Sequence, residues 1–311
     1  MALQRIALVI AARSMAWRWV AGLALLTASS GCSSPGAAPS ASSAQDAGAG
    51  DDAGTKPCGP PPGGWEAGRD PPAPCVREVR GAVRVAGGGA LASPDVSVCG
   101  RACFRGRGDA TGAFRVPVNT HLPEGGYVLF VHGRPAHAST FVRLPPSPPE
   151  NVDLGTLVVP AFTSVGAALP ADGAPATTVT AGAISLSVAA DTTWDLAIED
   201  LLDEAEGRKL RVAAGPAPDV AGGAALVYAL GPFSATPSKK VGLRVNEAGG
   251  MSAGAAVEIL EMAPLGLEGE NAAGRMRIAA RGHVSADGKG IETDPGEGLT
   301  VLTWVAIRPV R

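Results

Sequence analysis

Five cysteines carry the clearest chemistry in the 311-residue sequence, and the first of them points to covalent lipid attachment. Cys32 follows a start with three arginines, an almost wholly apolar stretch at residues 19–28 and the small residues Ser29-Ser30-Gly31. This order is typical of a bacterial signal peptide with a lipoprotein cleavage site, so we expect Cys32 to become the lipidated N-terminus of the mature chain. A plainly secreted protein is the alternative, because Ser29 stands where such sites usually have leucine. The apolar stretch is too short for a transmembrane helix, which needs about 20 residues.

The other four cysteines are Cys58, Cys75, Cys99 and Cys103, an even set that is compatible with two disulfides in an oxidising compartment. We favour Cys99–Cys103 as a clip across a tight turn and Cys58–Cys75 as the closure of a proline-rich segment, although other pairings are possible. A zinc site is the alternative, but the C-x3-C spacing has no matching pair of histidines.

A group of acids near the C-terminus could bind a hard cation. Asp287, Glu292, Asp294 and Glu297 could gather carboxylate oxygens around calcium. Their spacing misses the Asp-x-Asp-x-Asp-Gly pattern of a calcium loop, and glycines beside acids are equally what turns require. We therefore expect neither a metal nor another cofactor, and interpret these residues as parts of turns.

Composition indicates the kind of elements that carry these residues. The 42 glycines and 27 prolines, with 4% aromatic residues, favour many short strands joined by tight turns. The net charge of −3 becomes more negative once residues 1–31 are removed, and the sequence has no basic run, which argues against nucleic-acid binding. The sequence contains no nucleophile elbow, phosphate loop or zinc-hydrolase motif, so we do not expect an enzyme.

Changes in composition and in the pattern of apolar residues along the chain predict its domain organisation. Residues 1–31 form the expected signal peptide, and residues 32–75 a flexible Ser/Ala/Gly/Pro-rich tether that ends in a cysteine-containing collar. Alternating apolar residues then predict an antiparallel β-sandwich at residues 76–166. A linker at residues 167–175 leads to a second β-sandwich at residues 176–311, so the expected fold class is all-β.

Local signals add one helix and two turns to this plan. One helix face carries the apolar residues Trp194, Ala197, Ile198, Leu201, Leu202 and Ala205, with acids on the other face. We expect this apolar stripe to face the core and Gly207 to end the helix. Asp109–Gly112 is typical of a type I turn, and Asp287-Gly288 of a hairpin.

Four segments of the first sandwich together form a family-like pattern: Val79–Val85, Ser93–Val98, Asp109–Phe114 and Gly126–Val131. With them, residues 76–160 resemble the carboxypeptidase regulatory-like domain, a small prealbumin-type sandwich. The resemblance implies a non-catalytic accessory module of the kind found on surface and secreted proteins. The inserted Cys99–Cys103 segment departs from the plain pattern.

Three segments carry a second resemblance: Gly231–Val245, Met251–Ile259 and Gly282–Ile291. With them, residues 176–311 resemble a C-terminal β-sandwich domain of secreted bacterial lipoproteins, itself similar to the domain shared by ankyrins and netrin receptors. Either resemblance implies assembly or binding more than turnover.

In some relatives of the netrin-receptor domain, a His-x-Ser tripeptide marks self-cleavage, and His283-Val284-Ser285 has this form. His283 would deprotonate the Ser285 hydroxyl, which would attack the preceding carbonyl in an N-to-O acyl shift. The alternative, which we favour, places His283 and Ser285 on the solvent face of a strand around a buried Val284.

These observations together predict a non-catalytic, lipid-anchored envelope protein that binds or scaffolds at the outer membrane or cell surface. Its membrane contact would be the lipid on Cys32, and its partner an envelope protein or polysaccharide. The loops Cys99–Gly108 and Gly282–Gly298 are the expected contact sites, because sandwiches carry function on their loops. The alternatives are an accessory subunit of an envelope enzyme complex and a self-cleaving surface protein.

Overall fold

The computed structural model describes residues 58–59, 73–100, 102–122, 127–133, 135–203, 205–215, 222–265 and 273–310. The expected signal peptide, Cys32 and most of the tether and collar lie outside these residues. Thr55–Arg311 forms one compact unit. The described part consists of strands with one short helix, so the prediction of an all-β protein is confirmed.

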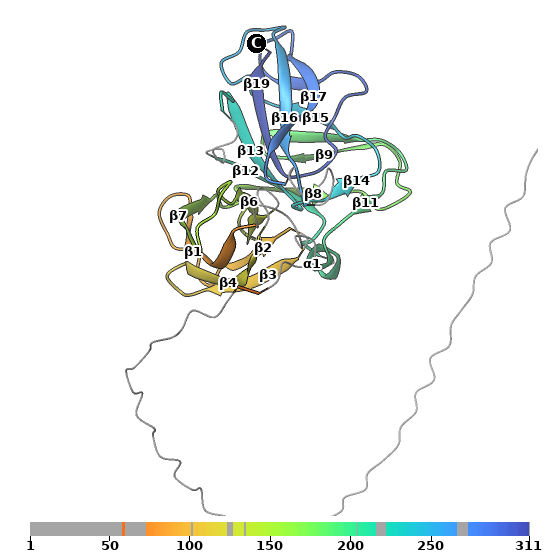
Figure 1. The fold of residues 1–311 in the computed structure, drawn as a ribbon. Helices are drawn as coiled ribbons and strands as arrows, with labels where there is room; N and C mark the ends of the chain where they lie inside the picture. Colours follow the sequence, from red (N-terminus) through yellow and green to blue (C-terminus); the bar gives the residue numbers. More distant parts are fainter. Residues whose placement is uncertain are drawn as a thin grey trace, which may run out of the picture. The chain divides into compact units, whose positions relative to one another are not determined.

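The first sheet has seven strands in the order β6-β5-β2-β3-β4-β1-β7 (Figure 1). Its strands are β1 (Cys75–Val85), β2 (Asp95–Cys99), β3 (Cys103–Gly108), β4 (Ala113–His121), β5 (Val128–His132), β6 (Thr140–Arg143) and β7 (Asn151–Val159). The expectation of a purely antiparallel arrangement is wrong at one edge, where β7 runs parallel to β1. The seven residues 144–150 carry the chain from β6 at one edge of the sheet to β7 at the other edge, where β7 lies beside β1.

Strict alternation in the sequence explains the core of this sheet. In β4 the residues Phe114, Val116 and Val118 are buried and their neighbours are exposed, which is the period of two expected for a half-buried strand. These side chains join a cluster with the valines of β1 and β2. The predicted turn at Asp109–Gly112 connects β3 to β4, and Gly112 N donates to Asp109 O at 3.0 Å.

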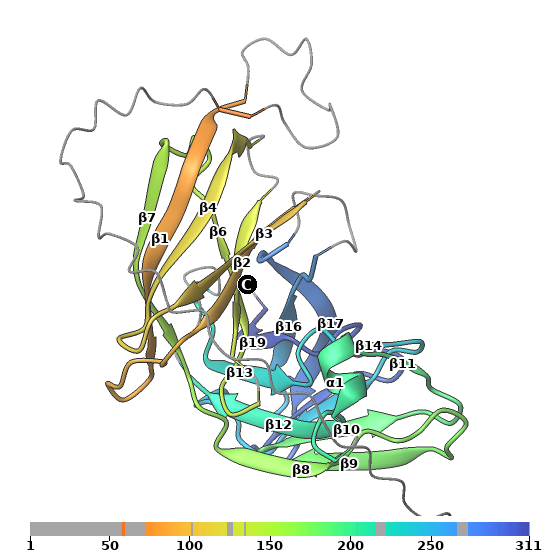
Figure 2. The same cartoon turned by 90° about the horizontal axis from the view of Figure 1, so that it is seen from below.

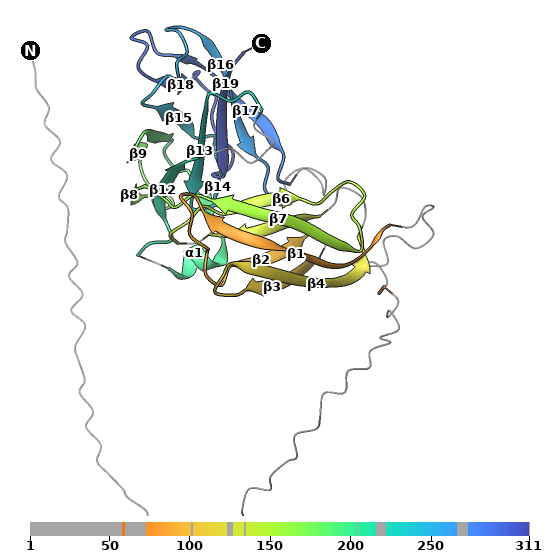
Figure 3. The same ribbon diagram turned by 90° about the vertical axis from the view of Figure 1, so that its left-hand side faces the viewer.

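The second sheet has ten strands in the order β8-β12-β13-β19-β16-β17-β18-β15-β10-β9 (Figures 2 and 3). Its strands are β8 (Ser164–Ala168), β9 (Thr177–Ala181), β10 (Ile184–Val188), β12 (Lys209–Ala214), β13 (Leu226–Gly231), β15 (Gly242–Val245), β16 (Ala256–Met262), β17 (Met276–Val284), β18 (Ile291–Thr293) and β19 (Trp304–Pro309). A two-stranded ladder of β11 (Trp194–Asp195) and β14 (Thr236–Pro237) accompanies it, together with the helix α1 (Ile198–Leu202). β8 therefore already belongs to the second sheet, before the linker expected at residues 167–175.

The second sheet curls around its own apolar core until its two edge strands approach each other. The core draws on nearly all of its strands and includes Leu186, Leu230 and Ile259. A Cβ atom at Gly166 in β8 would lie 2.0 Å from the Thr180 carbonyl oxygen in β9, so only glycine permits this approach. Because the edge strands β8 and β9 approach each other, their unpaired backbone groups are shielded from pairing with another chain.

A further apolar cluster connects the two sheets. Phe141 of β6 packs with Phe233, which follows β13, and their ring centroids are 5.5 Å apart. Trp304 of β19 is buried in the same cluster, and its indole Nε1 donates to the Ser139 carbonyl at 2.9 Å. The two sandwiches therefore share buried surface in addition to their separate cores.

The helix differs from the sequence expectation in length and in orientation. α1 covers only Ile198–Leu202, and Trp194 lies in β11 instead of in the helix. Trp194 and Leu196 are buried, but Ile198, Leu201 and Leu202 are 66%, 55% and 78% exposed. The prediction that the whole apolar stripe faces the core is therefore wrong. The stripe combines two buried residues of an extended segment with three exposed residues of a short helix, because Ala197 between them has extended backbone angles.

Candidate functional site

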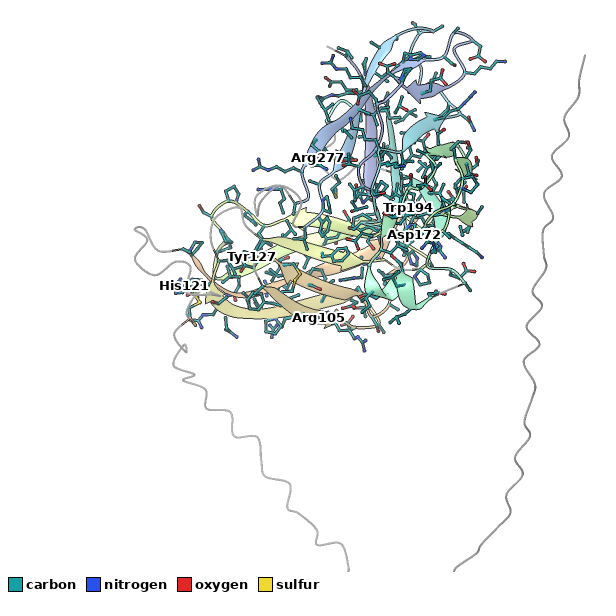
Figure 4. The ribbon with its side chains drawn as sticks, turned by 90° about the vertical axis from the view of Figure 1, so that its right-hand side faces the viewer. Arg105, His121, Tyr127, Asp172, Trp194 and Arg277 are labelled. Atoms are coloured by element: carbon teal, nitrogen blue, oxygen red, sulfur yellow. A yellow bond between two sulfur atoms is a disulfide. The ribbon has the colours of Figure 1, made fainter. Side chains whose placement is uncertain are left out.

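The four cysteines expected to form disulfides do so in the favoured pairing. Cys99 and Cys103 face each other across the β2–β3 hairpin, with Cα atoms 4.1 Å apart. Cys58 joins Cys75, the first residue of β1, next to His121 on the neighbouring strand (Figure 4). Both bridges fasten backbone segments at the end of a strand, which is a structural task. Cys32 lies outside the described residues, so its lipidation stays a prediction.

His283 and Ser285 each have other partners. His283 Nδ1 lies 2.8 Å from Asp294 Oδ1, and its Nε2 lies 3.5 Å from Glu292 Oε1. Ser285 Oγ donates to Asp287 Oδ1 at 2.6 Å and accepts from the Gly290 amide at 3.0 Å. The serine hydroxyl thus closes a hairpin turn, and the imidazole is held by two carboxylates across the β17–β18 pair.

Val284 between them is fully buried, in agreement with the alternation expected of a strand. Self-cleavage requires that the imidazole reach the hydroxyl proton. The contacts of His283 and Ser285 instead resemble those of residues that hold a hairpin in place. Self-cleavage is the alternative that the sequence does not favour, and no contact of His283 or Ser285 in this geometry favours it either.

The acids considered for calcium binding also interact with other protein groups, each with a different partner. Asp287 accepts hydrogen bonds from the Ser285 hydroxyl and the Lys289 amide, and these bonds hold its pKa below the ordinary value for an aspartate. Asp294 contacts His283, and Glu297 contacts Lys240 Nζ at 3.2 Å. Across the described ranges, no three His, Cys, Asp or Glu side chains come together in a way that could hold a metal ion.

Asp294 and Glu297 nevertheless line a polar groove of about 410 Å³ on the second sandwich. Lys240, Arg244 and Glu292 contribute to its walls, so the groove is lined by charges of both signs. Such a lining offers hydrogen bonds to a polar ligand but concentrates no single charge. The groove includes part of the segment Gly282–Gly298 that the sequence suggested as a contact loop. The expectation of a loop is wrong for its strand residues, because Gly282–Val284 belong to β17 and Ile291–Thr293 to β18.

A second pocket, of about 210 Å³, lies beside α1. Four carboxylates line it, from Glu199, Asp200, Asp203 and Glu206, together with Pro135, His137, Ser139, Phe162, Gly207, Arg211, Gly231, Pro232 and Phe233. Glu206 accepts hydrogen bonds from Lys209 at 2.6 Å and from Arg211 at 2.9 Å, and the bond from Lys209 is the main reason that its pKa is lowered. The pocket is therefore acidic along the α1 side and apolar around Phe162 and Phe233.

α1 is the feature that sequence analysis placed wrongly. Its acids Asp200 and Glu199 line the pocket, and Asp200 is only 8% exposed, whereas its three apolar side chains face solvent. The sequence pattern indicates that the helix has an apolar face and an acidic face, but it does not indicate which of the two faces the protein. Which face is turned toward the protein depends on neighbours such as His137 and Phe162, which come from distant parts of the chain.

Comparison with known proteins does not identify the chain. No family model matches it. No curated protein matches it either. Within the described residues, none of the helices is long and apolar enough to cross a membrane.

Proposed function

We propose that this chain is a non-catalytic, lipid-anchored envelope protein that binds or scaffolds at the outer membrane or cell surface. The lipid anchor rests on the sequence before Cys32. The non-catalytic part is supported by the structural bonds of the reactive candidates: His283 contacts Asp294, and Ser285 contacts Asp287 and Gly290. Three surface features could contact a ligand or partner: a polar groove, an acidic pocket and a set of exposed apolar side chains. Surface of this kind serves binding.

The sandwich architecture supports finer assignments that belong to the same proposal. The first sandwich would be a carboxypeptidase regulatory-like module, as Val79–Val85 and Asp109–Phe114 suggested. The second would correspond to the C-terminal domain of secreted bacterial lipoproteins. Both kinds of module bind or assemble, which agrees with a protein held at the envelope by its N-terminus.

The lipid anchor is tested by the intact mass of the protein extracted from its native membrane without reduction. We expect one species that begins at Cys32, carries acyl chains, and is four hydrogens lighter than the reduced form because of two disulfides. A species that begins at another residue or lacks lipid would overturn the anchor. A fragment that begins at Ser285 would overturn the non-catalytic assignment, and Ser285→Ala would then restore the full-length chain.

An accessory subunit of an envelope enzyme complex is the second candidate. The exposed apolar face of α1 favours it, because isolated soluble proteins seldom leave several large aliphatic side chains of one short helix in water. Such a subunit would co-purify with one catalytic partner in constant ratio after gentle detergent extraction. A scaffold would be recovered without an enzyme.

A further inference from the structure

The orientation of α1 is opposite to that of an ordinary surface helix. Ile198, Leu201 and Leu202 are spaced i, i+3 and i+4, so they share one helix face. This face points to solvent, with Leu202 the most exposed large apolar side chain among the described residues at 78%. A surface helix normally turns such a face toward the core.

The opposite face of α1 is turned toward the protein and carries a buried carboxylate. Asp200 lies on that face and lines the pocket, whereas Glu199, next to Ile198, and Asp203, next to Leu202, line the same pocket from the border of the apolar face. Asp200 is 8% exposed, although an aspartate is rarely buried. The fold therefore keeps a carboxylate inside and leaves three aliphatic side chains outside. Exposed aliphatic side chains that share one helix face are typical of a surface that a partner covers.

The charge around the apolar face limits what can cover it. Residues 195–211 contain six acidic and three basic residues. Two of the basic residues, Lys209 and Arg211, already pair with Glu206. Glu199 and Asp203, which adjoin Ile198 and Leu202 in the sequence, are exposed. A partner that covers Leu201 and Leu202 must therefore tolerate, or use, negative charge at the rim.

Two occupants are disfavoured by this charge. A membrane surface with anionic headgroups would be repelled by the acids, since such surfaces attract basic segments. A second copy of this chain would bring two acidic rims together around one apolar contact, and like charges facing each other across an interface cost affinity.

We propose that the apolar face of α1 docks a partner-protein segment whose aliphatic side chains are flanked by lysine or arginine. The aliphatic side chains would pack on Ile198, Leu201 and Leu202, and the basic side chains would reach the carboxylates of Glu199 and Asp203. This proposal deepens the binding function proposed above and rests on it. The contact is small, so the expected binding is weak and reversible, at the low end of protein interfaces.

The test uses the chain from Ser33 onward, which lacks the expected lipid, and a synthetic probe. The probe is a fluorescent amphipathic peptide of leucine and lysine, about 18 residues or five helical turns long. A matched peptide carries glutamate in place of lysine. Fluorescence anisotropy of each peptide is measured against the wild-type chain and against the double variant Leu201→Ser/Leu202→Ser.

Control variants separate the α1 face from apolar exposure in general. Ile278→Ser removes another exposed aliphatic side chain, which is 53% exposed on β17 and follows Arg277. Glu199→Gln/Asp203→Asn keeps the apolar face and removes its charge. Ile198→Ser gives an independent disruption of the face if the leucine double variant fails to fold, as judged by thermal unfolding.

We expect the leucine–lysine peptide to bind the wild type and the Ile278→Ser variant alike. The leucine double variant should weaken binding by about tenfold or more, which corresponds to about 1.4 kcal/mol. The charge variant should weaken it less, with a smaller dependence on salt. Equal binding of the glutamate peptide, or equal loss in Ile278→Ser, would overturn the proposal.

Two further measurements distinguish the other occupants. Sedimentation velocity over a range of concentrations would reveal a dimer that Leu202→Ser abolishes, and co-sedimentation with phosphatidylglycerol vesicles would reveal a membrane contact. Either result would overturn the proposed partner. Failure of the docking proposal would leave the lipid anchor untouched, because the mass of the membrane-extracted protein tests that anchor separately.

Discussion

At the scale of single residues, Glu261 has the most consequential environment in the structure. Its side chain is fully buried in β16. Oε1 accepts a hydrogen bond from Arg277 Nη2 at 2.7 Å, and Oε2 accepts one from the Thr300 amide at 2.9 Å (Figure 4 labels Arg277). The carboxylate thus fastens the loop before β19 to β16 and β17.

We predict that Glu261→Ala lowers the free energy of unfolding by about 3–5 kcal/mol, because it removes one member of a buried charged pair. Urea denaturation measures the loss. Lys240→Ala breaks the exposed pair with Glu297 and should cost at most about 1 kcal/mol. Similar losses for the two variants would show that burial of Glu261 does not increase the contribution of its contacts to the free energy of unfolding.

Tyr228 provides a pH-dependent prediction. Burial is the main cause that raises its pKa above the ordinary value of 10.0, and the hydrogen bond to Glu247 and the charge of that residue add to the effect. The folded state therefore favours the neutral phenol. Its contribution to stability is complete below pH 10 and is lost as the pH rises toward the folded pKa.

The measurement is alkaline unfolding monitored together with tyrosinate absorbance. In the wild type, ionisation of Tyr228 should be delayed beyond that of free tyrosine and should accompany loss of structure. In Tyr228→Phe this alkaline step should be reduced, leaving Tyr127 as the remaining tyrosine. Early ionisation of both tyrosines with the fold intact would contradict the prediction.

Residue roles could be predicted from the sequence where they depend on near neighbours. The disulfide Cys99–Cys103 and the turn at Asp109 involve residues within a few positions of each other, so their spacing is informative. Glu261 could not be recognised, because its partner Thr300 is 39 positions away and only the ladder β16–β19 brings them together.

At the scale of elements, the Asp109 side chain adds to the backbone hydrogen bonds that form the β3–β4 hairpin. Asp109 accepts hydrogen bonds from the Thr111 hydroxyl at 2.6 Å and from the amides of Thr111 at 2.8 Å and Ala113 at 3.2 Å. The bond from the Thr111 hydroxyl is the largest reason that the pKa of Asp109 is lowered. The ionised carboxylate is therefore the form that stabilises the turn.

We predict that Asp109→Ala lowers the melting temperature at neutral pH and that this difference shrinks in acid. A depressed pKa gives stability that is present above the ordinary aspartate pKa of 3.8 and lost as the pH falls through the folded value. Melting curves across this range test the prediction. Asp172→Ala, at an exposed turn of the second sandwich, is the control, and an equal and pH-independent loss in both variants would refute the role of Asp109 (Figure 4).

The contrast between this hairpin and α1 shows which elements the sequence can predict. A turn needs only its own residues, and Asp109–Gly112 appears as expected. The helical period at residues 194–205 runs across two kinds of backbone, because Trp194 pairs with Pro237 in a short ladder. Long-range pairing therefore shortened the helix, and the sequence period alone contains no sign of it.

At the scale of the whole molecule, the all-β class followed from composition and alternation, but the contact between the sandwiches did not. Phe233 and Trp304 have the apolar character of any core residue, and nothing local distinguishes a side chain that packs against its own sheet from one that packs against the other. The contact requires Phe130 and Phe141, more than 90 positions earlier in the chain. Its existence predicts that the two sandwiches unfold together.

Phe233→Ala tests this coupling. Phe233 is 2% exposed, and its ring centroid lies 5.8 Å from that of Phe130. Removal of a buried aromatic ring costs about 3–5 kcal/mol, and here the loss falls on the surface that the two sandwiches share. In calorimetry the wild type should therefore unfold in one transition and Phe233→Ala in two.

Val241→Ala, within the core of the second sandwich, is the control. It should lower the temperature of a single transition without dividing it, because the surface shared by the two sandwiches stays intact. Two transitions already present in the wild type would mean that the shared cluster is too weak to couple the sandwiches.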